Sequence, residues 1–336
     1  MKIFWVLLLP AALTADSIPR IGSIDYYGIR KVPESHIQKA LGVAVGDPLP
    51  SSKGDVEDRL AEVPGVVLAR LEAVCCDGNR GMLFVGIEEK GAAHFELRTP
   101  PAGDVTLPKE LSDPYQDLVA AIERAAHRGS TAEDLTHGHP LAADPDARAM
   151  QEGFVQLVPQ HLLQIRDVLR NSADPDQRAM AASLIGYARE KSAVVGDLEY
   201  AMQDPDENVR GDAMSALSAI AVLAKKQPEL TIHISPTWFV EMLNSVVLSD
   251  RIKAAKALVN LTDARPAGTL DLLRERALPA LAEMAQWHSL PYALPAFLLL
   301  GRVGGFSDKQ IQDRWTRGDR EAFVREVIAH GKKKRG

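Results

Sequence analysis

Cysteine is scarce in this 336-residue chain, and its only two cysteines, Cys75 and Cys76, are neighbours. On a strand, adjacent side chains point to opposite faces, so a disulfide between these two would be strained. We interpret them as packed thiols of a core, and a redox role is the alternative.

The sequence also lacks the motifs that mark common enzymes. It contains no Gly-x-Ser-x-Gly, no His-Glu-x-x-His, no phosphate-cradling glycine loop and no Cys-x-x-Cys. Carboxylates are frequent, but those of Asp174-Pro-Asp and Asp204-Pro-Asp suit turns and helix caps. We therefore expect a protein that is not an enzyme, with no catalytic residue, no cofactor and no metal.

Only one apolar run stands out, and it lies at the beginning of the chain. Lys2 precedes the apolar residues 3–13, and small residues end at Ala15, which is the pattern of a cleavable signal peptide over residues 1–15. The run is too short to cross a bilayer comfortably. The expected location is therefore secreted or periplasmic, with no transmembrane segment after cleavage. A net charge of −6 argues against binding of nucleic acid.

The rest of the chain is organised around a repeat in residues 174–224. Asp174-Pro-Asp is followed by Arg178 and spaced Ala and Leu residues, and Asp204-Pro-Asp is followed by Arg210 and the same pattern. A spacing of about 32 residues is typical of two-helix solenoid repeats. Pro and Asp start each helix, and small Ala lets neighbouring helices approach closely.

This pattern resembles the HEAT repeat, and more closely its short variant in phycobilisome-lyase-like proteins. A third copy begins at Asp250-Arg251 after a longer loop, and a degenerate fourth covers residues 278–303. We expect an all-α HEAT-like solenoid over residues 148–330, in which Pro159 kinks or divides the first long helix. The basic residues 331–336 are expected to form a solvated tail, and contact with an anionic lipid or an acidic partner is the alternative.

Residues 21–98 differ from the repeats and indicate the order β-α-α-β-β. Gly28 ends a first strand, and Gly46-Asp-Pro forms a turn. Pro64-Gly65-Val66 starts a second strand, and the Asp77–Gly81 turn leads from it into the third strand. This order of elements and these local sequence patterns resemble a POTRA domain, the polypeptide-transport-associated module. The resemblance implies binding of other chains, commonly at an exposed sheet edge.

Residues 99–147 are expected to be a linker with one helix and an irregular loop. The loop contains His137 and His139 beside several Asp residues. A His-x-His pair can bind a metal, but a polar loop that caps the next helix, or a loop that contacts a partner, explains the same residues.

The sequence thus predicts a multidomain α+β protein that acts as a non-enzymatic interaction or assembly scaffold of the cell envelope, bound to protein partners through the solenoid face and the sheet edge. The alternatives are an envelope-biogenesis factor that handles outer-membrane proteins, and a lyase-like or metal-dependent enzyme on the HEAT scaffold. Residues near the starts of the second helices are the candidate partner contacts, although the arginines could instead tie adjacent turns: Arg178, Arg210, Asp212, Arg251 and Lys253.

Overall fold

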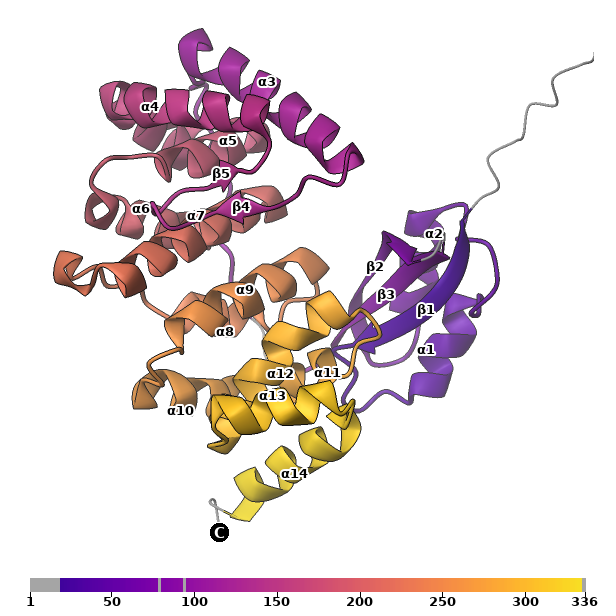
Figure 1. The fold of residues 1–336 in the computed structure, drawn as a ribbon. Helices are drawn as coiled ribbons and strands as arrows, with labels where there is room; N and C mark the ends of the chain where they lie inside the picture. Colours follow the sequence, from indigo (N-terminus) through magenta and orange to yellow (C-terminus); the bar gives the residue numbers. More distant parts are fainter. Residues whose placement is uncertain (1–18, 78–79, 93–94, 334–336) are drawn as a thin grey trace, which may run out of the picture.

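The chain forms a small sheet domain beside a long stack of helices (Figure 1). This computed structural model describes residues 19–77, 80–92 and 95–333. The predicted signal peptide, residues 1–15, lies outside the described residues. Within those three ranges, no helix combines the length and the hydropathy that crossing a bilayer requires.

The N-terminal domain has the predicted order of elements. Ser52 starts the second helix, because its Oγ accepts a hydrogen bond from the Asp55 N–H at 3.2 Å. Gly42 ends the first helix with a φ of 71°, a value that side-chain-bearing residues rarely adopt. The elements are β1 (Arg20–Tyr27), α1 (Glu34–Leu41), α2 (Lys53–Ala61), β2 (Val66–Asp77) and β3 (Arg80–Glu89).

The sheet has β3 in its middle, with β1 parallel to it on one side and β2 antiparallel on the other. Helices α1 and α2 cover one face, where Ile37 and Leu60 are fully buried. The outer strands are β1 and β2. Part of β1 is covered, since the Gly46 N–H donates to the Ile21 carbonyl at 2.8 Å, so β2 presents the longer outer edge.

The helical part begins earlier than the sequence predicts. Helix α3 (Lys109–His127), which falls in the predicted linker, packs on α4 (Pro145–Asn171) and shares its apolar core. The short strands β4 (Glu133–Asp134) and β5 (Leu141–Ala142) pair between these helices. Pro159 does not divide α4, because Val158 and Ile165 are fully buried and hold the helix to its neighbours across the proline.

The predicted repeats follow as helices that begin at capping aspartates. The Asp174 carboxylate accepts the Asp176 N–H at 2.9 Å, and the Asp206 carboxylate accepts the Asn208 N–H at 2.9 Å. The helices are α5 (Pro175–Ile185), α6 (Val195–Ala201), α7 (Glu207–Lys226), α8 (Thr237–Met242), α9 (Leu248–Leu261), α10 (Ala267–Arg276), α11 (Leu278–Met284), α12 (Leu290–Gly304), α13 (Asp308–Thr316) and α14 (Arg320–Lys333).

Helices α4, α5, α7, α9, α12 and α14 pack in succession and form a helical-repeat solenoid (Figure 1). Ala181, Ala213 and Ala254 are fully buried at the same position of successive helices, which permits the close approach that the repeat predicts. Helix α14 extends to Lys333 and so enters the predicted basic tail; residues 334–336 lie outside the described residues.

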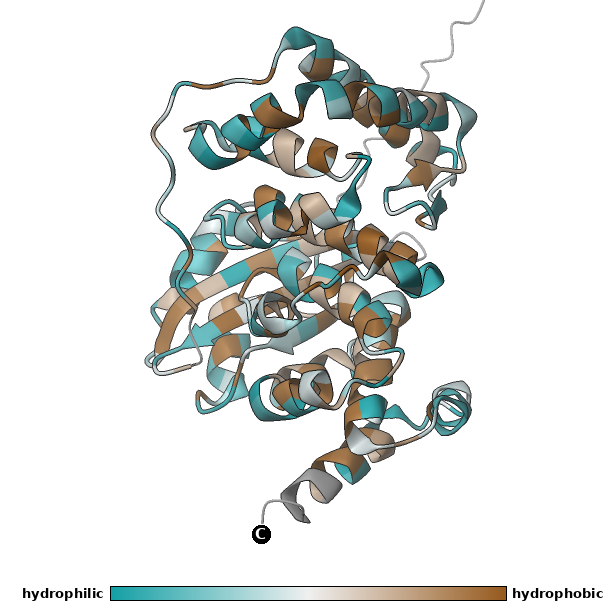
Figure 2. Ribbon diagram, turned by 90° about the vertical axis from the view of Figure 1, so that its left-hand side faces the viewer, coloured by the Kyte–Doolittle hydropathy of each residue, from teal (hydrophilic) through white to brown (hydrophobic). Residues whose placement is uncertain are grey.

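An extended strap, residues 95–107, connects the sheet domain to α3 along the side of the solenoid (Figure 2). Its Arg98 N–H donates to the Gln203 carbonyl at 2.8 Å, and the Arg98 guanidinium lies 3.4 Å from the centre of the Tyr200 ring. Gly103 donates its N–H to the Asn171 carbonyl at 2.9 Å. A Cβ at Gly103 would lie 2.5 Å from that same oxygen, so the close approach requires glycine. The strap is therefore fixed to the repeats that it crosses.

The second face of the sheet packs on the last repeats of the solenoid. Tyr27 and Phe84 contact Trp287 edge-on, with ring centres 5.7 and 5.3 Å apart, and Trp287 is 2% exposed. The Tyr27 hydroxyl donates to the Val246 carbonyl at 2.9 Å. Apolar residues of the sheet are thus covered on both faces, by α1 and α2 on one and by the solenoid on the other.

Polar contacts surround this aromatic interface. Glu283 accepts the Gly28 N–H at 3.2 Å and pairs with Arg30. The Asp25 carboxylate lies 2.7 Å from His288 Nδ1, and burial raises the pKa of this acid although His288 opposes the shift. The domain junction is therefore a buried, hydrogen-bonded contact.

Candidate functional site

The three arginines predicted to contact a partner lie inside the chain. Arg178 is 2% exposed and binds Asp204 through two hydrogen bonds, of 2.9 Å from Nε and 2.8 Å from Nη2. Its third nitrogen donates to the carbonyls of Ser172 and Ala173. This guanidinium ties adjacent turns, which is the alternative that the sequence left open.

Arg210 repeats the arrangement one hairpin later, with a hydrogen bond of 2.7 Å from Nη2 to Asp250. Arg251 differs, because its guanidinium lies 4.6 Å from the centre of the Tyr27 ring and 3.5 Å from Glu283 at the domain junction. Burial lowers its pKa to about 10. These arginines hold repeats and domains together, and each is only 2% exposed.

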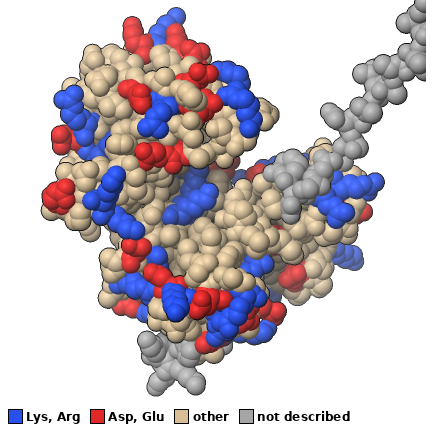
Figure 3. All heavy atoms as spheres, viewed as in Figure 1, with Lys and Arg blue, Asp and Glu red and all other residues tan. Residues whose placement is uncertain are grey.

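Asp212 and Lys253, the other two predicted contacts, meet in a pocket of about 410 Å³. We name it the charged pocket. Its walls come from α3, the β4–β5 hairpin, and the neighbouring long helices α4, α5, α7 and α9. Figure 3 shows basic side chains lying in a hollow at the middle of the helical stack. The site is therefore built where several repeats meet.

Two acids and two lysines line the charged pocket: Asp212 on α7, Glu133 on β4, and Lys253 and Lys256 on α9. Lys253 Nζ lies 4.0 Å from the Asp212 carboxylate. Among the described residues, none donates a hydrogen bond to the carboxylate of Asp212 or Glu133, and neither ammonium group donates one. The charges of this pocket are thus weakly compensated within the chain.

Both acids show the effect of their surroundings. Burial raises the pKa of Asp212 to about 6, although Lys253 opposes the shift, and the nearby Asp206 adds to it. Burial also raises the pKa of Glu133, against the attraction of Lys256. Groups that supply positive charge or hydrogen-bond donors would therefore be stabilised beside these two carboxylates.

Aromatic and apolar side chains complete the pocket. Tyr115 on α3 and Tyr187 at the end of α5 line it, and burial raises the pKa of both hydroxyls. The Tyr187 hydroxyl donates to the Pro140 carbonyl at 3.3 Å. Val119 and Ile122 also line the pocket and are 40% and 39% exposed. The pocket therefore offers an apolar wall as well as charged groups.

Sequence reasoning missed Lys256, Glu133 and Tyr115. Lys256 follows Lys253 by three residues on the same helix, so the two share a face, and this signal was available. Glu133 and Tyr115 lie in the segment that the sequence assigned to a linker. Their position depends on α3 folding back onto the stack, which no local pattern indicates.

The His-rich loop is held by contacts that leave His139 directed into the chain. His139 Nδ1 lies 3.1 Å from Lys191 Nζ, which also donates to the Gly186 carbonyl at 2.6 Å. The His139 ring packs on Tyr187 with centres 5.2 Å apart. Burial, with Lys191 beside it, lowers the pKa of His139 to about 4, and burial lowers that of Lys191 to about 8.

Metal binding by this loop finds no support in the described geometry. Asp134 lies 3.7 Å from His137 Nε2, and the rings of His137 and His139 are 6.1 Å apart. No three His, Cys, Asp or Glu side chains of the described residues converge on one point. The side chains of Cys75 and Cys76 lie outside that description.

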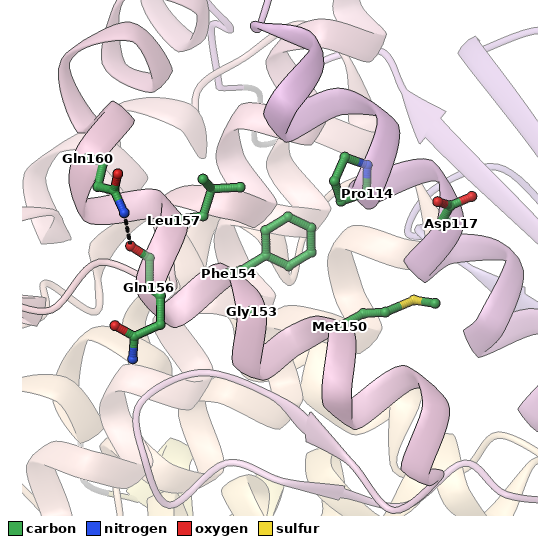
Figure 4. A pocket seen from close by; sticks show the side chains of 8 residues that line it. All are labelled: Pro114, Asp117, Met150, Gly153, Phe154, Gln156, Leu157 and Gln160. Atoms are coloured by element: carbon green, nitrogen blue, oxygen red, sulfur yellow. Dashed lines mark hydrogen bonds between the residues drawn. The ribbon is translucent and has the colours of Figure 1, made fainter.

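A second hollow, of about 400 Å³, lies between α3 and α4 (Figure 4). Met150 and Phe154 extend from α4 toward α3, where Pro114 and Asp117 line the opposite side. Asp117 is the one charged group among the residues that line it. This hollow is apolar and offers few groups that would orient a ligand, in contrast to the charged pocket.

Comparison with known proteins assigns no family to the chain. No family model matches it, and no curated protein matches it. Among solved structures it is similar to the designed armadillo repeat protein YIII(Dq)4CqI, at 15% identity and a TM-score of 0.36, over 56% of this chain and 95% of that one.

A computationally designed armadillo repeat protein for modular peptide recognition is also similar, at 14% identity and a TM-score of 0.35, over 56% of this chain and 94% of that one. Scores of this size carry no argument about function. The repeat architecture rests on the packing of this chain's own helices.

Proposed function

We propose that this protein is a non-enzymatic scaffold of the cell envelope that binds a segment of a partner protein in its charged pocket. The observation that supports this most is the set of four weakly compensated charges in one pocket of a repeat stack. Stacked repeats present extended surfaces that suit protein partners. A pocket that crosses several repeats would fix the register of a bound segment.

Catalysis has less support in the same pocket. Its Ser215 hydroxyl donates to the Gly211 carbonyl at 2.9 Å, so this candidate nucleophile is engaged by its own helix. Lys253, the base nearest to Asp212, lies at salt-bridge distance and not at the distance of a proton-transferring hydrogen bond. Neither of these two contacts is a hydrogen bond between a nucleophile and a base.

The proposed family relationships follow from sequence resemblance. The solenoid resembles HEAT repeats of the phycobilisome-lyase-like kind, and the β-α-α-β-β domain resembles a POTRA domain. The outer edge of β2 is the proposed second docking surface, because β3 is central and β1 is partly covered. Partner strands can add to such an edge through backbone hydrogen bonds.

The proposed location rests on the signal-peptide pattern of residues 1–15. Mass spectrometry of the protein purified from its own envelope fraction would identify its N-terminus. We expect the mature chain to begin just after Ala15. An intact Met1 on protein from the cytoplasmic fraction would contradict the envelope assignment.

Capture of partners from the envelope fraction tests the binding role. We expect the mature protein to retain a partner that the double variant Lys253→Gln/Lys256→Gln loses about tenfold or more. Lys226→Gln is the matched control, since Lys226 is an exposed lysine of α7 outside the pocket. Equal capture by all three proteins would contradict the proposal. Recovery of nascent outer-membrane chains in place of a folded partner would favour the envelope-biogenesis alternative.

A further inference from the structure

The charged pocket has charges of opposite sign on different elements. Its lysines, Lys253 and Lys256, both come from α9 and lie one helical turn apart. Its acids come from α7 and β4, and each lies beside a lysine: Lys253 Nζ is 4.0 Å from Asp212, and Lys256 attracts Glu133. A ligand that enters the pocket thus meets two lysines from one helix, the positive wall, with an acid beside each of them.

The chain makes room for this arrangement at a glycine. A Cβ at Gly211, inside α7, would lie 2.6 Å from Lys253 Nζ. Glycine in the interior of a helix costs about 1 kcal/mol relative to alanine. Here it leaves space for the Lys253 ammonium, which lies 4.0 Å from the Asp212 carboxylate.

We infer that the charged pocket takes an extended peptide segment in which a basic residue stands next to an acidic one. The acidic side chain would contact Lys253 and Lys256, and the basic side chain would contact Asp212 and Glu133. This inference rests on the proposed function and adds the chemistry of the bound segment to it.

The volume and the apolar wall agree with such a segment. Pockets of about 300 to 1,000 Å³ bind ligands of small-molecule size, and 410 Å³ accommodates a few side chains and not a folded element. Val119 and Ile122 on α3 are positioned to contact an apolar residue that flanks the charged pair. Like charges on the ligand would leave one wall of the pocket uncompensated and cost affinity.

Binding of this segment should depend on pH through Asp212. The groups that face it are Lys253 on α9, Tyr115 on α3 and Asp206 at the start of α7. Because the pKa of Asp212 is about 6, its carboxylate is mostly protonated at about pH 5 and no longer attracts a basic side chain. We expect the affinity to fall several-fold between about pH 7.5 and about pH 5.

Four capped, fluorescent hexapeptides that differ only in their central pair test the inference on the full mature chain. The pairs are Lys-Asp, Lys-Lys, Asp-Asp and Gln-Asn, and fluorescence anisotropy measures their affinities. We expect the Lys-Asp peptide to bind about tenfold more tightly than the other three. The Lys226→Gln protein should show the same ranking.

Two pocket variants should change the ranking in opposite directions. Asp212→Asn/Glu133→Gln removes the negative groups, so the Asp-Asp peptide should become the best ligand. Lys253→Gln/Lys256→Gln removes the positive wall, so the Lys-Lys peptide should become the best ligand. Circular dichroism would establish that both variants are folded.

The outcomes separate this inference from the proposed function. Equal affinity for all four peptides, or a ranking that neither variant changes, would overturn the inference. Capture of a partner that still depends on Lys253 and Lys256 would then keep the scaffold function. Absence of peptide binding, together with partner capture that the lysine variant does not affect, would overturn both.

Discussion

Individual charged residues of the solenoid divide into two groups by their position around each helix. Arg210 and Asp212, and likewise Arg251 and Lys253, are two residues apart, so their side chains point about 200° apart on an α-helix. The arginines face the turns and the core, whereas Asp212 and Lys253 face the charged pocket. The sequence identified all of them as one set, and helical geometry alone could have separated them.

Asp212 leads to a prediction about stability and pH. Its pKa of about 6 lies above the ordinary 3.8, so between those values the folded state holds a proton that the unfolded state releases. Stability therefore falls as pH rises through this window. Asp212→Asn should raise the free energy of unfolding at about pH 7.5, by about 1 kcal/mol after allowance for partial exposure, and have less effect at about pH 4.

Urea unfolding at the two pH values measures this difference. Asp313→Asn is the control, because Asp313 is an exposed aspartate on α13. A loss of stability that is the same at both pH values would contradict the prediction and indicate that pairing with Lys253 outweighs the cost of burial.

At the level of elements, much of the solenoid could be predicted from the sequence. The Asp-Pro-Asp turns, the arginine spacing and the buried alanines recur because each hairpin meets the same neighbours. Two features of the structure differ from what the local pattern indicates. Pro159 lies within α4 and does not divide it, and α3 joins the stack although its segment contains no repeat signature. Tertiary packing determines both the continuity of α4 and the position of α3, and no local sequence pattern indicates that packing.

Arg178 shows how one hairpin is tied to the next. Its guanidinium and the Asp204 carboxylate are both buried, at 2% and 0% exposure. Arg178→Met should leave the carboxylate with the Arg98 guanidinium, 3.3 Å away, as its one remaining ion-pair partner among the described residues. We expect the free energy of unfolding to fall by about 3 kcal/mol, the lower end of the range for a broken buried pair.

Chemical denaturation checks this value against Arg325→Met. Arg325 pairs with Glu321 on the surface of α14, so its loss should change stability by about 0.5 kcal/mol or less. Equal effects of the two substitutions would show that the buried pair does not tie the hairpins.

For the whole molecule, the sequence predicted two domains but not the contact between them. In the sequence, nothing distinguishes Phe84 and Tyr27 from other strand residues, and Trp287 belongs to a loop between predicted helices. Only the fold shows that these rings meet, because they lie about 200 residues or more apart in the chain. The contact between the sheet and the last repeats is a packed interface.

Gly86 offers a way to test whether the domains unfold together. A Cβ there would lie 2.5 Å from the Tyr27 hydroxyl and 2.6 Å from the Val246 carbonyl. Gly86→Ala should force the sheet away from the solenoid, cost about 1 to 3 kcal/mol, and split the thermal unfolding into separate transitions for the two domains.

Scanning calorimetry records those transitions. Gly54→Ala on α2 is the matched control, since an added Cβ there meets open space. A Gly86→Ala protein that unfolds in the same single transition as the Gly54→Ala protein would show that the interface does not couple the domains.

The strap gives the chain an order of assembly. It carries the polypeptide from the sheet to α3, while the sheet itself packs on Trp287 and Tyr292, about 200 residues after Phe84 in the chain. The sheet is therefore synthesised before the residues that cover it, and its Phe84 face stays uncovered until Trp287 and Tyr292 have emerged from the ribosome. We expect a slow step late in folding, in which the sheet docks on the solenoid. A chain truncated before α11 should aggregate through the uncovered Phe84 face of the sheet.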